Sequence, residues 1–145
     1  MRFPIALFLS FLVTAAAAQT AVVETFPTRL RGTYIITHST EYQKDAKTGE
    51  FPVFKHEDLK EISPITLRFR ARDVYFPAQK KSLVPDTIAI TVGEERQVMW
   101  IKTFDAEKGH SETGLLHVTP GGGVFIFLDD TRANTRTIWR GSEYR

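Results

Sequence analysis

Short runs in which apolar and polar residues alternate dominate the chain, and no long segment shows the period of a helix. The clearest run is ITLRFRAR, residues 65–72, in which apolar side chains alternate with Thr66, Arg68, Arg70 and Arg72. Successive side chains of a strand point to opposite faces of the sheet. The run therefore predicts a half-buried strand with one apolar face and one arginine-rich face.

Further strands are expected where short segments rich in β-branched and aromatic residues lie between glycines and prolines. These segments are 30–38, 51–54, 74–76, 87–92, 97–104, 115–118, 124–128 and 135–140. Segments 87–92 and 97–104 predict a hairpin around the GEER turn. HEDLKEISP, from His56, is polar and is expected to hold at most a single helical turn, and PAQKKSLVP, residues 77–85, reads as a loop.

About eight short sequential strands in a chain of 145 residues are typical of an all-β domain. We expect a small antiparallel β-barrel, because the turns are short and the strands follow one another along the chain. A two-sheet β-sandwich is the alternative.

Three glycines, Gly121 to Gly123, precede the apolar run VFIFL and could suggest a phosphate-binding loop. Such a loop leads into a helix and is followed by a lysine, whereas these glycines lead into a strand without one. Pro120 suits the second position of a β-turn and Gly121 the third, where φ is positive in a type II turn. TPGGG is therefore predicted to join two antiparallel strands.

The first residues, MRFPIALFLSFLVTAAAAQT, have the basic start, apolar centre and small residues of a secretory signal peptide. Cleavage is expected between Ala18 and Gln19, which would leave residues 19–145 as a single β domain in the periplasm or outside the cell. A spanning helix needs roughly 20 apolar residues, so no membrane anchor is expected after cleavage. Removal of Arg2 leaves 18 basic and 17 acidic residues, and this balance does not suggest nucleic-acid binding.

The chemistry-bearing residues form no recognisable catalytic or metal-binding motif. Cysteine is absent, and the four histidines (His38, His56, His110 and His117) have no ligand spacing such as H-x-x-x-H. No serine lies in the glycine-flanked elbow of a hydrolase. The sequence therefore predicts no catalytic residue, no metal site and no cofactor, and it favours a protein that is not an enzyme.

Two strands are apolar on both faces. Val98 and Trp100 alternate with Met99 and Ile101, and in residues 124–128 every position is apolar. A strand of this kind needs cover on both sides, so it lies centrally in a core, lines an internal cavity or forms a patch for a partner. All three arrangements fit the sequence.

The stretch LRGTYIITH resembles the first strand of lipocalin-like proteins, in which a G-x-W motif opens a small barrel. Gly32-Thr33-Tyr34 occupies the matching place, with tyrosine instead of tryptophan. The C-terminal TIWRGSEYR is similar to the last strand of such barrels, where an arginine packs over the motif aromatic. The resemblance covers these two ends only, and it implies a cation–π contact of Arg140 with Tyr34 and a small apolar ligand inside the barrel.

We therefore expect a non-catalytic binding protein that holds a small apolar ligand. The expected ligand-binding residues are Tyr34, Phe69, Trp100, Phe125 and Phe127. The alternative is a protein-interaction or inhibitor module that binds an envelope or secreted partner. Its expected contact residues are Arg68, Arg70, Arg72, Lys80 and Lys81, because loops and charged strand faces on rigid β scaffolds commonly perform recognition.

Overall fold

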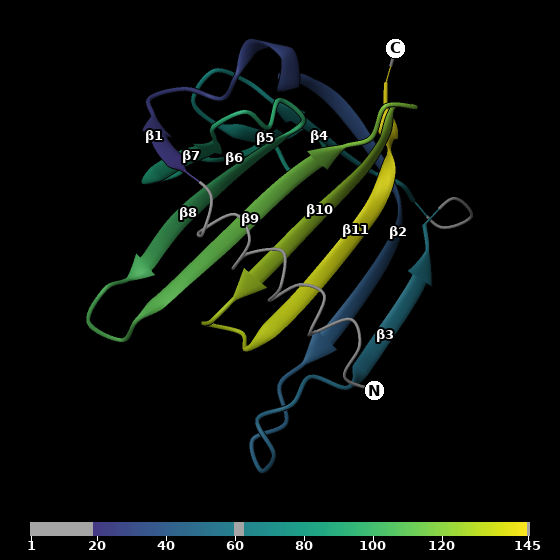
Figure 1. Ribbon diagram of the computed structural model, residues 1–145. Coiled ribbons are helices and arrows are strands. Elements are labelled where there is room, and N and C mark those ends of the chain that lie inside the picture. Colours follow the sequence, from purple (N-terminus) through teal and green to yellow (C-terminus); the bar gives the residue numbers. More distant parts are fainter. Residues whose placement is uncertain (1–18, 60–62, 145) are drawn as a thin grey trace.

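The computed structural model of the chain describes residues 19–59 and 63–144, and these form one strongly curled antiparallel sheet. The sheet has the shape of a half-barrel (Figure 1), so the prediction of an antiparallel all-β domain is confirmed. All strands belong to this single sheet, which excludes the two-sheet sandwich for the described residues. The expected signal peptide, residues 1–18, lies outside the described residues.

The described residues contain eleven strands and one short 3-10 helix, where the sequence predicted about eight strands. The strands are β1 (Thr20–Val23), β2 (Gly32–Gln43), β3 (Val53–Asp58), β4 (Ile65–Phe69), β5 (Val74–Phe76), β6 (Lys81–Leu83), β7 (Thr87–Thr91), β8 (Gln97–Asp105), β9 (His110–Val118), β10 (Gly123–Asp130) and β11 (Thr135–Glu143), and the 3-10 helix η1 is Thr28–Leu30. Their order in the sheet is β1-β7-β8-β9-β10-β11-β2-β4-β5-β6, and β3 also pairs with β2.

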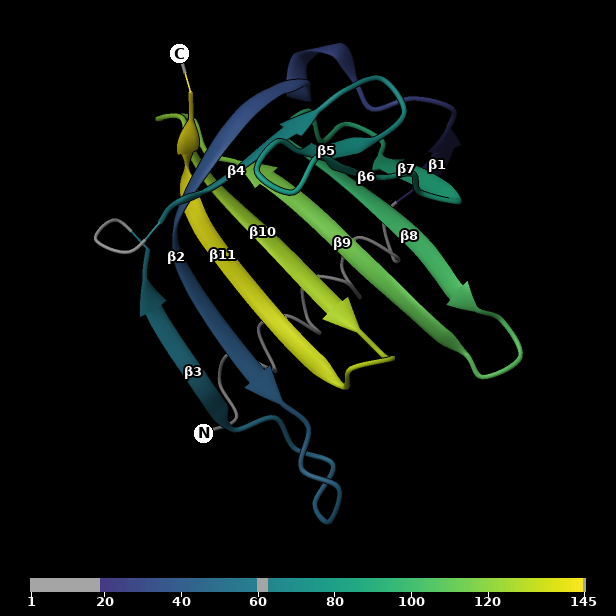
Figure 2. The ribbon, with the colours of Figure 1, turned by 180° about the vertical axis from the view of Figure 1, so that it is seen from behind.

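Strand β2 determines how the sheet curls, because it has two neighbours on one edge. Its first half, Gly32 to Ile36, pairs with β4, and its second half, His38 to Tyr42, pairs with β3. On its other edge β2 pairs with β11 along nearly its whole length. Figure 2 shows the consequence: β3 continues the broad sheet, whereas β4, β5 and β6 turn over its concave side.

An irregularity in the β2–β11 pairing accompanies this bend. Arg140 lies opposite His38 while the next residue, Gly141, lies opposite Ile36, so one residue of β2 is extra. A β-bulge of this kind bends the strand and increases its local twist. A Cβ atom on Gly141 would lie 1.9 Å from the carbonyl oxygen of Ile35, so the two backbones approach more closely than a side chain permits.

A cluster of buried aromatic rings closes the upper end of the half-barrel. Phe69 packs edge-to-face against Phe26, Tyr34 and Trp100, with ring centroids 5.3, 5.5 and 5.4 Å away. Phe26 is fully buried, and its backbone N–H donates to the carbonyl of Ala71. The Tyr34 hydroxyl donates to the carbonyl of Leu30 in η1, which ties the 3-10 helix to this end.

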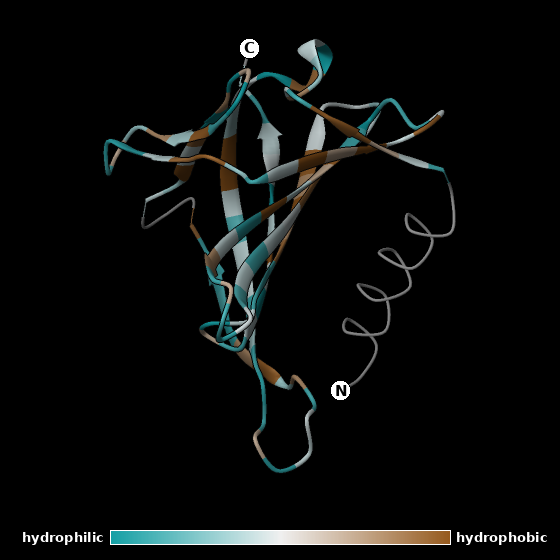
Figure 3. Cartoon of the chain, turned by 90° about the vertical axis from the view of Figure 1, so that its left-hand side faces the viewer, coloured by the Kyte–Doolittle hydropathy of each residue, from teal (hydrophilic) through white to brown (hydrophobic). Residues whose placement is uncertain are grey.

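Hydrophilic residues prevail in the loops that project from the sheet, as the side view in Figure 3 shows. Several details differ from the prediction. Strands β1 and β6 were missed, since β6 lies inside the segment read as the loop PAQKKSLVP, and β3 extends to Asp58 through residues read as a helical turn. Strand β4 ends at Phe69, because Arg70 already bonds to Asp73 across a tight turn.

The TPGGG segment joins β9 to β10, as predicted. The N–H of Gly122 donates to the carbonyl of Thr119, which places Pro120 at the second position of the turn. The positive φ, however, belongs to Gly122 (+86°) and not to Gly121. The turn is therefore a tight turn followed by a left-handed residue, which is a common hairpin geometry.

Candidate functional site: a cavity on the concave face

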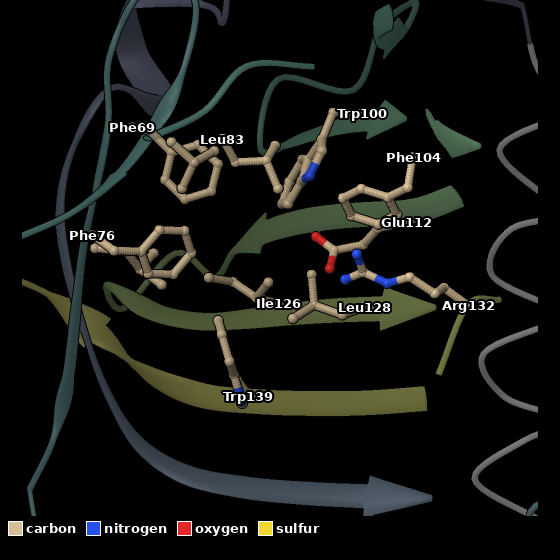
Figure 4. A pocket seen from close by; sticks show the side chains of 12 residues that line it. Phe69, Phe76, Leu83, Trp100, Phe104, Glu112, Ile126, Leu128, Arg132 and Trp139 are labelled. Carbon is tan, nitrogen blue, oxygen red and sulfur yellow. The ribbon is translucent and has the colours of Figure 1, made fainter. Parts of the chain in front are cut away.

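A cavity of about 270 Å³ lies on the concave side of the sheet, beneath the strands that turn over it. Figure 4 shows its lining, which is contributed by strands β4, β5, β6, β8, β9, β10 and β11 and by the turn after β10. The lining residues are Leu67, Phe69, Val74, Phe76, Leu83, Trp100, Phe104, Glu112, Ile126, Leu128, Arg132 and Trp139. Ten of these twelve side chains are apolar or aromatic, so the cavity suits an apolar molecule.

The wall formed by Trp100 depends on a glycine in the neighbouring strand. Trp100 lies directly opposite Gly114 of β9, and a Cβ atom at Gly114 would lie 2.1 Å from the indole ring. The missing side chain leaves the space over β9 that the indole ring occupies. Trp100 is only 3% exposed, and its indole N–H has no hydrogen-bond partner among residues 19–59 and 63–144.

One end of the cavity is charged. Lys102 of β8 and Asp130 of β10 both lie directly opposite Glu112 of β9, so the three side chains share the concave face. Arg132 lies in the turn after β10, with its guanidinium group 3.9 Å from the centre of the Phe104 ring and 3.8 Å from Asp130. Since Phe104 is 37% exposed, this charged end is the mouth of the cavity.

Glu112 is the carboxylate that faces the cavity. Burial raises the pKa of Glu112, the nearby charge of Asp130 raises it further, and Arg132 partly opposes both effects. The two cations at the mouth already have carboxylate partners, because Lys102 is 3.8 Å from Asp86 and Arg132 pairs with Asp130. Within residues 19–59 and 63–144, no hydrogen bond or ion pair occupies the Glu112 carboxylate.

The structure brings two of the five predicted ligand-binding residues to the cavity. Phe69 and Trp100 line it directly, whereas Tyr34 lies behind Phe69 in the closed end. Phe125 and Phe127 stack on each other, with centroids 6.3 Å apart, on the opposite face of β10 from Ile126 and Leu128. These two phenylalanines therefore do not line the cavity.

Sequence reasoning missed the polar end of the site, namely Glu112, Arg132 and Phe104, and the tryptophan on β11, Trp139. Alternation along β8 places Trp100 and Phe104 on one face, which is a signal that the sequence does contain. No such signal exists for Glu112, because its position beside the cavity depends on the pairing of β9 with both β8 and β10.

The predicted arginine stripe does not form, because β4 ends before its second member. Arg68 lies on the strand and donates to Thr33, whereas Arg70 lies in the following turn, where it binds Asp73 and Ser82 and stacks over Tyr75 at 4.5 Å. Arg72 lies beside β1 in a shallow surface groove. Lys80 and Lys81 are both exposed: Lys80 ends the turn before β6, with a positive φ of 52°, and Lys81 is the first residue of β6.

The expected contact between Arg140 and Tyr34 is wrong. Arg140 lies opposite His38, and Tyr34 lies opposite Glu143, three residues further along β11. Arg140 is exposed, whereas Tyr34 is only 2% exposed and packs against Phe69. The register of the β2–β11 pair and the bulge at Gly141 account for this separation.

In the part of the chain that the structure describes, no group of three or more His, Asp or Glu side chains is placed to hold a metal ion. The same residues contain no helix long and apolar enough to cross a membrane. The arrangement can enclose an apolar body and offer polar contacts at one end. No protein-family model, curated protein or solved structure matches the chain.

Proposed function

We propose that the protein is a non-catalytic binding protein that holds a small apolar ligand in the cavity on its concave face. The cavity carries this proposal, because ten apolar or aromatic side chains surround about 270 Å³ of space. This volume lies just below the range for ligand pockets, which begins at about 300 Å³, so only a small ligand fits. A ligand with one or two rings, or a short aliphatic chain, fits such a space.

The proposed site of action is the periplasm or the extracellular space. The support is the signal-peptide pattern of residues 1–18. Terminal sequencing of the protein isolated from its source should find Gln19 as the first residue. A ligand bound inside a curled antiparallel sheet is also the mode of action that the lipocalin-like resemblance of the two chain ends implies.

Calorimetric titration with naphthalene, a compact molecule without polar groups, tests the binding function. We expect binding to the wild-type protein and its loss in Leu128→Trp, because a larger side chain at Leu128 fills the cavity. Ile101→Trp is the matched control. Ile101 neighbours Trp100 on β8 but points to the other face and is 37% exposed, so this variant should bind as the wild type does.

Native mass spectrometry of protein purified from its source provides a second readout of the proposed function. A bound small molecule that Leu128→Trp excludes would support it. Absence of naphthalene binding, together with absence of any co-purified molecule, would contradict it.

The alternative function, a protein-interaction module, draws its support from the exposure of Lys80 and Lys81 on the turn into β6. A pull-down with the Lys80→Glu/Lys81→Glu double variant tests it. Partner capture that the double variant leaves unchanged would count against a role for these two lysines.

A further inference from the structure

The polar groups at the mouth of the cavity restrict what kind of apolar molecule fits it. This inference rests on the proposed function and concerns the same cavity. Among the cavity-lining groups of the described residues, two have neither a hydrogen bond nor an ion pair: the indole N–H of Trp100 and the carboxylate of Glu112. The first is a donor only and the second, when ionised, an acceptor only.

The unused donor is buried. Trp100 is 3% exposed, and its N–H has no partner in the part of the chain that the structure describes, although tryptophan N–H groups usually find one when they are buried. An unpaired buried donor is energetically unfavourable, and a ligand that supplies an acceptor removes this penalty. The ring lines the cavity, and Figure 4 shows its nitrogen on the side that faces Phe104 and Glu112.

The acceptor, the Glu112 carboxylate, lies on the same face of β9 as Gly114, over which the Trp100 ring lies. A Cβ atom at Gly114 would lie 2.7 Å from the indole nitrogen, and Glu112 precedes Gly114 by two residues on the same face. Residues two apart on one strand are separated by about 7 Å, and the Glu112 side chain extends toward the cavity. One small polar group between them can therefore meet both the N–H and the carboxylate.

The charges at the mouth distinguish among the head groups that such a ligand could carry. A carboxylate would accept from the Trp100 N–H but would face Glu112 and Asp130, two like charges. The cations that could offset them, Arg132 and Lys102, already pair with Asp130 and Asp86. An ammonium group would pair with Glu112 but would lie beside Arg132 and would leave the Trp100 N–H without an acceptor. A hydroxyl group can accept from the N–H and donate to the carboxylate at the same time.

We propose that the natural ligand is a neutral, apolar alcohol whose single hydroxyl group accepts a hydrogen bond from the Trp100 N–H and donates one to the Glu112 carboxylate. The apolar body of the ligand lies among Phe69, Phe76 and Leu83, and its hydroxyl group lies toward the mouth. Trp100 and Glu112 are thus the specificity-determining residues of the site.

Calorimetric titration with four probes that share one ring system tests this assignment. The probes are naphthalene, 2-naphthalenemethanol, 2-naphthoate and 2-naphthylmethylammonium, all at neutral pH. We expect the alcohol to bind about tenfold more tightly than naphthalene, because one or two net hydrogen bonds supply a factor of this size. The carboxylate and the ammonium probe should bind more weakly than the alcohol.

Two variants separate hydrogen bonding from packing. Trp100→Phe removes the N–H and keeps an aromatic wall, and Glu112→Leu removes the carboxylate and keeps a side chain of similar length. Each should reduce the advantage of the alcohol over naphthalene to less than about threefold, and the comparison of the two probes within one variant cancels any change in the packing around the shared ring system.

Each other outcome overturns the assignment in a distinct way. Tightest binding of the ammonium probe would assign the site to cations, and tightest binding of the carboxylate would assign it to anions. The alcohol and naphthalene could instead bind equally tightly, or the alcohol could keep its advantage in both variants. Either result would show that Trp100 and Glu112 do not recognise the hydroxyl group. Failure of all four probes, naphthalene included, would instead contradict the proposed binding function itself.

Discussion

Arg136 and Arg140 lie four residues apart on the same face of β11, yet their surroundings differ. The Arg136 side chain is 14% exposed, lies 4.2 Å from the centre of the Phe51 ring and pairs with Asp129 at 3.4 Å. Arg140 is exposed. The resemblance to lipocalin-like proteins had suggested the reverse, with Arg140 as the arginine that packs on an aromatic ring.

Arg136→Ala is therefore expected to lower the free energy of unfolding by about 2 kcal/mol, through loss of the cation–π contact and of the partner of Asp129. This corresponds to a melting temperature lower by roughly 8 °C in a domain of this size. Arg140→Ala should change the stability by less than about 0.5 kcal/mol. Equal midpoints in thermal melts of the two variants would contradict this difference.

Glu112 gives the protein a pH dependence of stability that an ordinary exposed carboxylate would not. Burial raises the pKa of Glu112 in the folded state above its ordinary value of 4.5. At pH values between 4.5, the pKa of Glu112 in the unfolded chain, and its raised pKa in the folded protein, the folded protein binds more protons than the unfolded chain. The free energy of unfolding therefore falls as the pH rises through this window. The neighbouring charge of Asp130 adds to the effect, and that of Arg132 opposes it without reversing its direction.

Glu112→Gln removes this titration. The variant is expected to be more stable than the wild type at pH 7, and the difference should disappear near pH 4, below both pKa values. Urea unfolding of the two proteins at several pH values measures this. A difference that stays constant with pH would show that the carboxylate is not desolvated in the folded protein.

At the level of the strands, the alternation of residues predicted where most strands begin, but their ends depend on partners elsewhere in the chain. The pattern of ITLRFRAR continues to Arg72, yet β4 ends at Phe69, because Arg70 binds Asp73 within the turn. In the other direction, β2 runs on to Gln43, beyond the predicted end at His38, since β11 pairs with it throughout. Neither partner could be identified from the local pattern.

The pairing of β2 with β11 requires a close approach of the two backbones at Gly141, beside the bulge in β2. Gly141→Ala would bring a methyl group to 1.9 Å from the carbonyl oxygen of Ile35, and a backbone atom cannot move aside as a flexible side chain can. We expect a loss of about 1 to 3 kcal/mol, as for an overpacked core. Gly121→Ala is the control, because its added methyl group meets no atom within 4 Å.

Denaturant unfolding of both glycine variants checks this expectation. A Gly141→Ala protein as stable as Gly121→Ala would mean that β11 can shift away from β2 without loss of pairing. Gly141 lies directly after the predicted last strand, residues 135–140, and its close approach to Ile35 follows from the register of the β2–β11 pair, which the local pattern does not contain.

For the molecule as a whole, the curl of the sheet decides which side chains face the cavity. Residues 124–128 are apolar at every position, so the sequence left open which face points inward. The pairing of β10 between β9 and β11 turns Ile126 and Leu128 to the concave side and Phe125 and Phe127 to the convex side. The all-β antiparallel class was predictable from the strand pattern, whereas the cavity depends on strands that are distant along the chain.

The composition of the cavity lining also means that the intrinsic tryptophan fluorescence of the protein reports on the cavity. The chain contains two tryptophans, Trp100 and Trp139, and both line the cavity. Light emitted after selective excitation of tryptophan therefore originates at one place in the molecule. A small molecule that enters the cavity displaces solvent from these rings and should change the wavelength maximum or the intensity of the fluorescence. A partner that docks on the outer edge of β6 should leave both unchanged. Collections of unlabelled compounds can thus be screened directly on the unmodified protein.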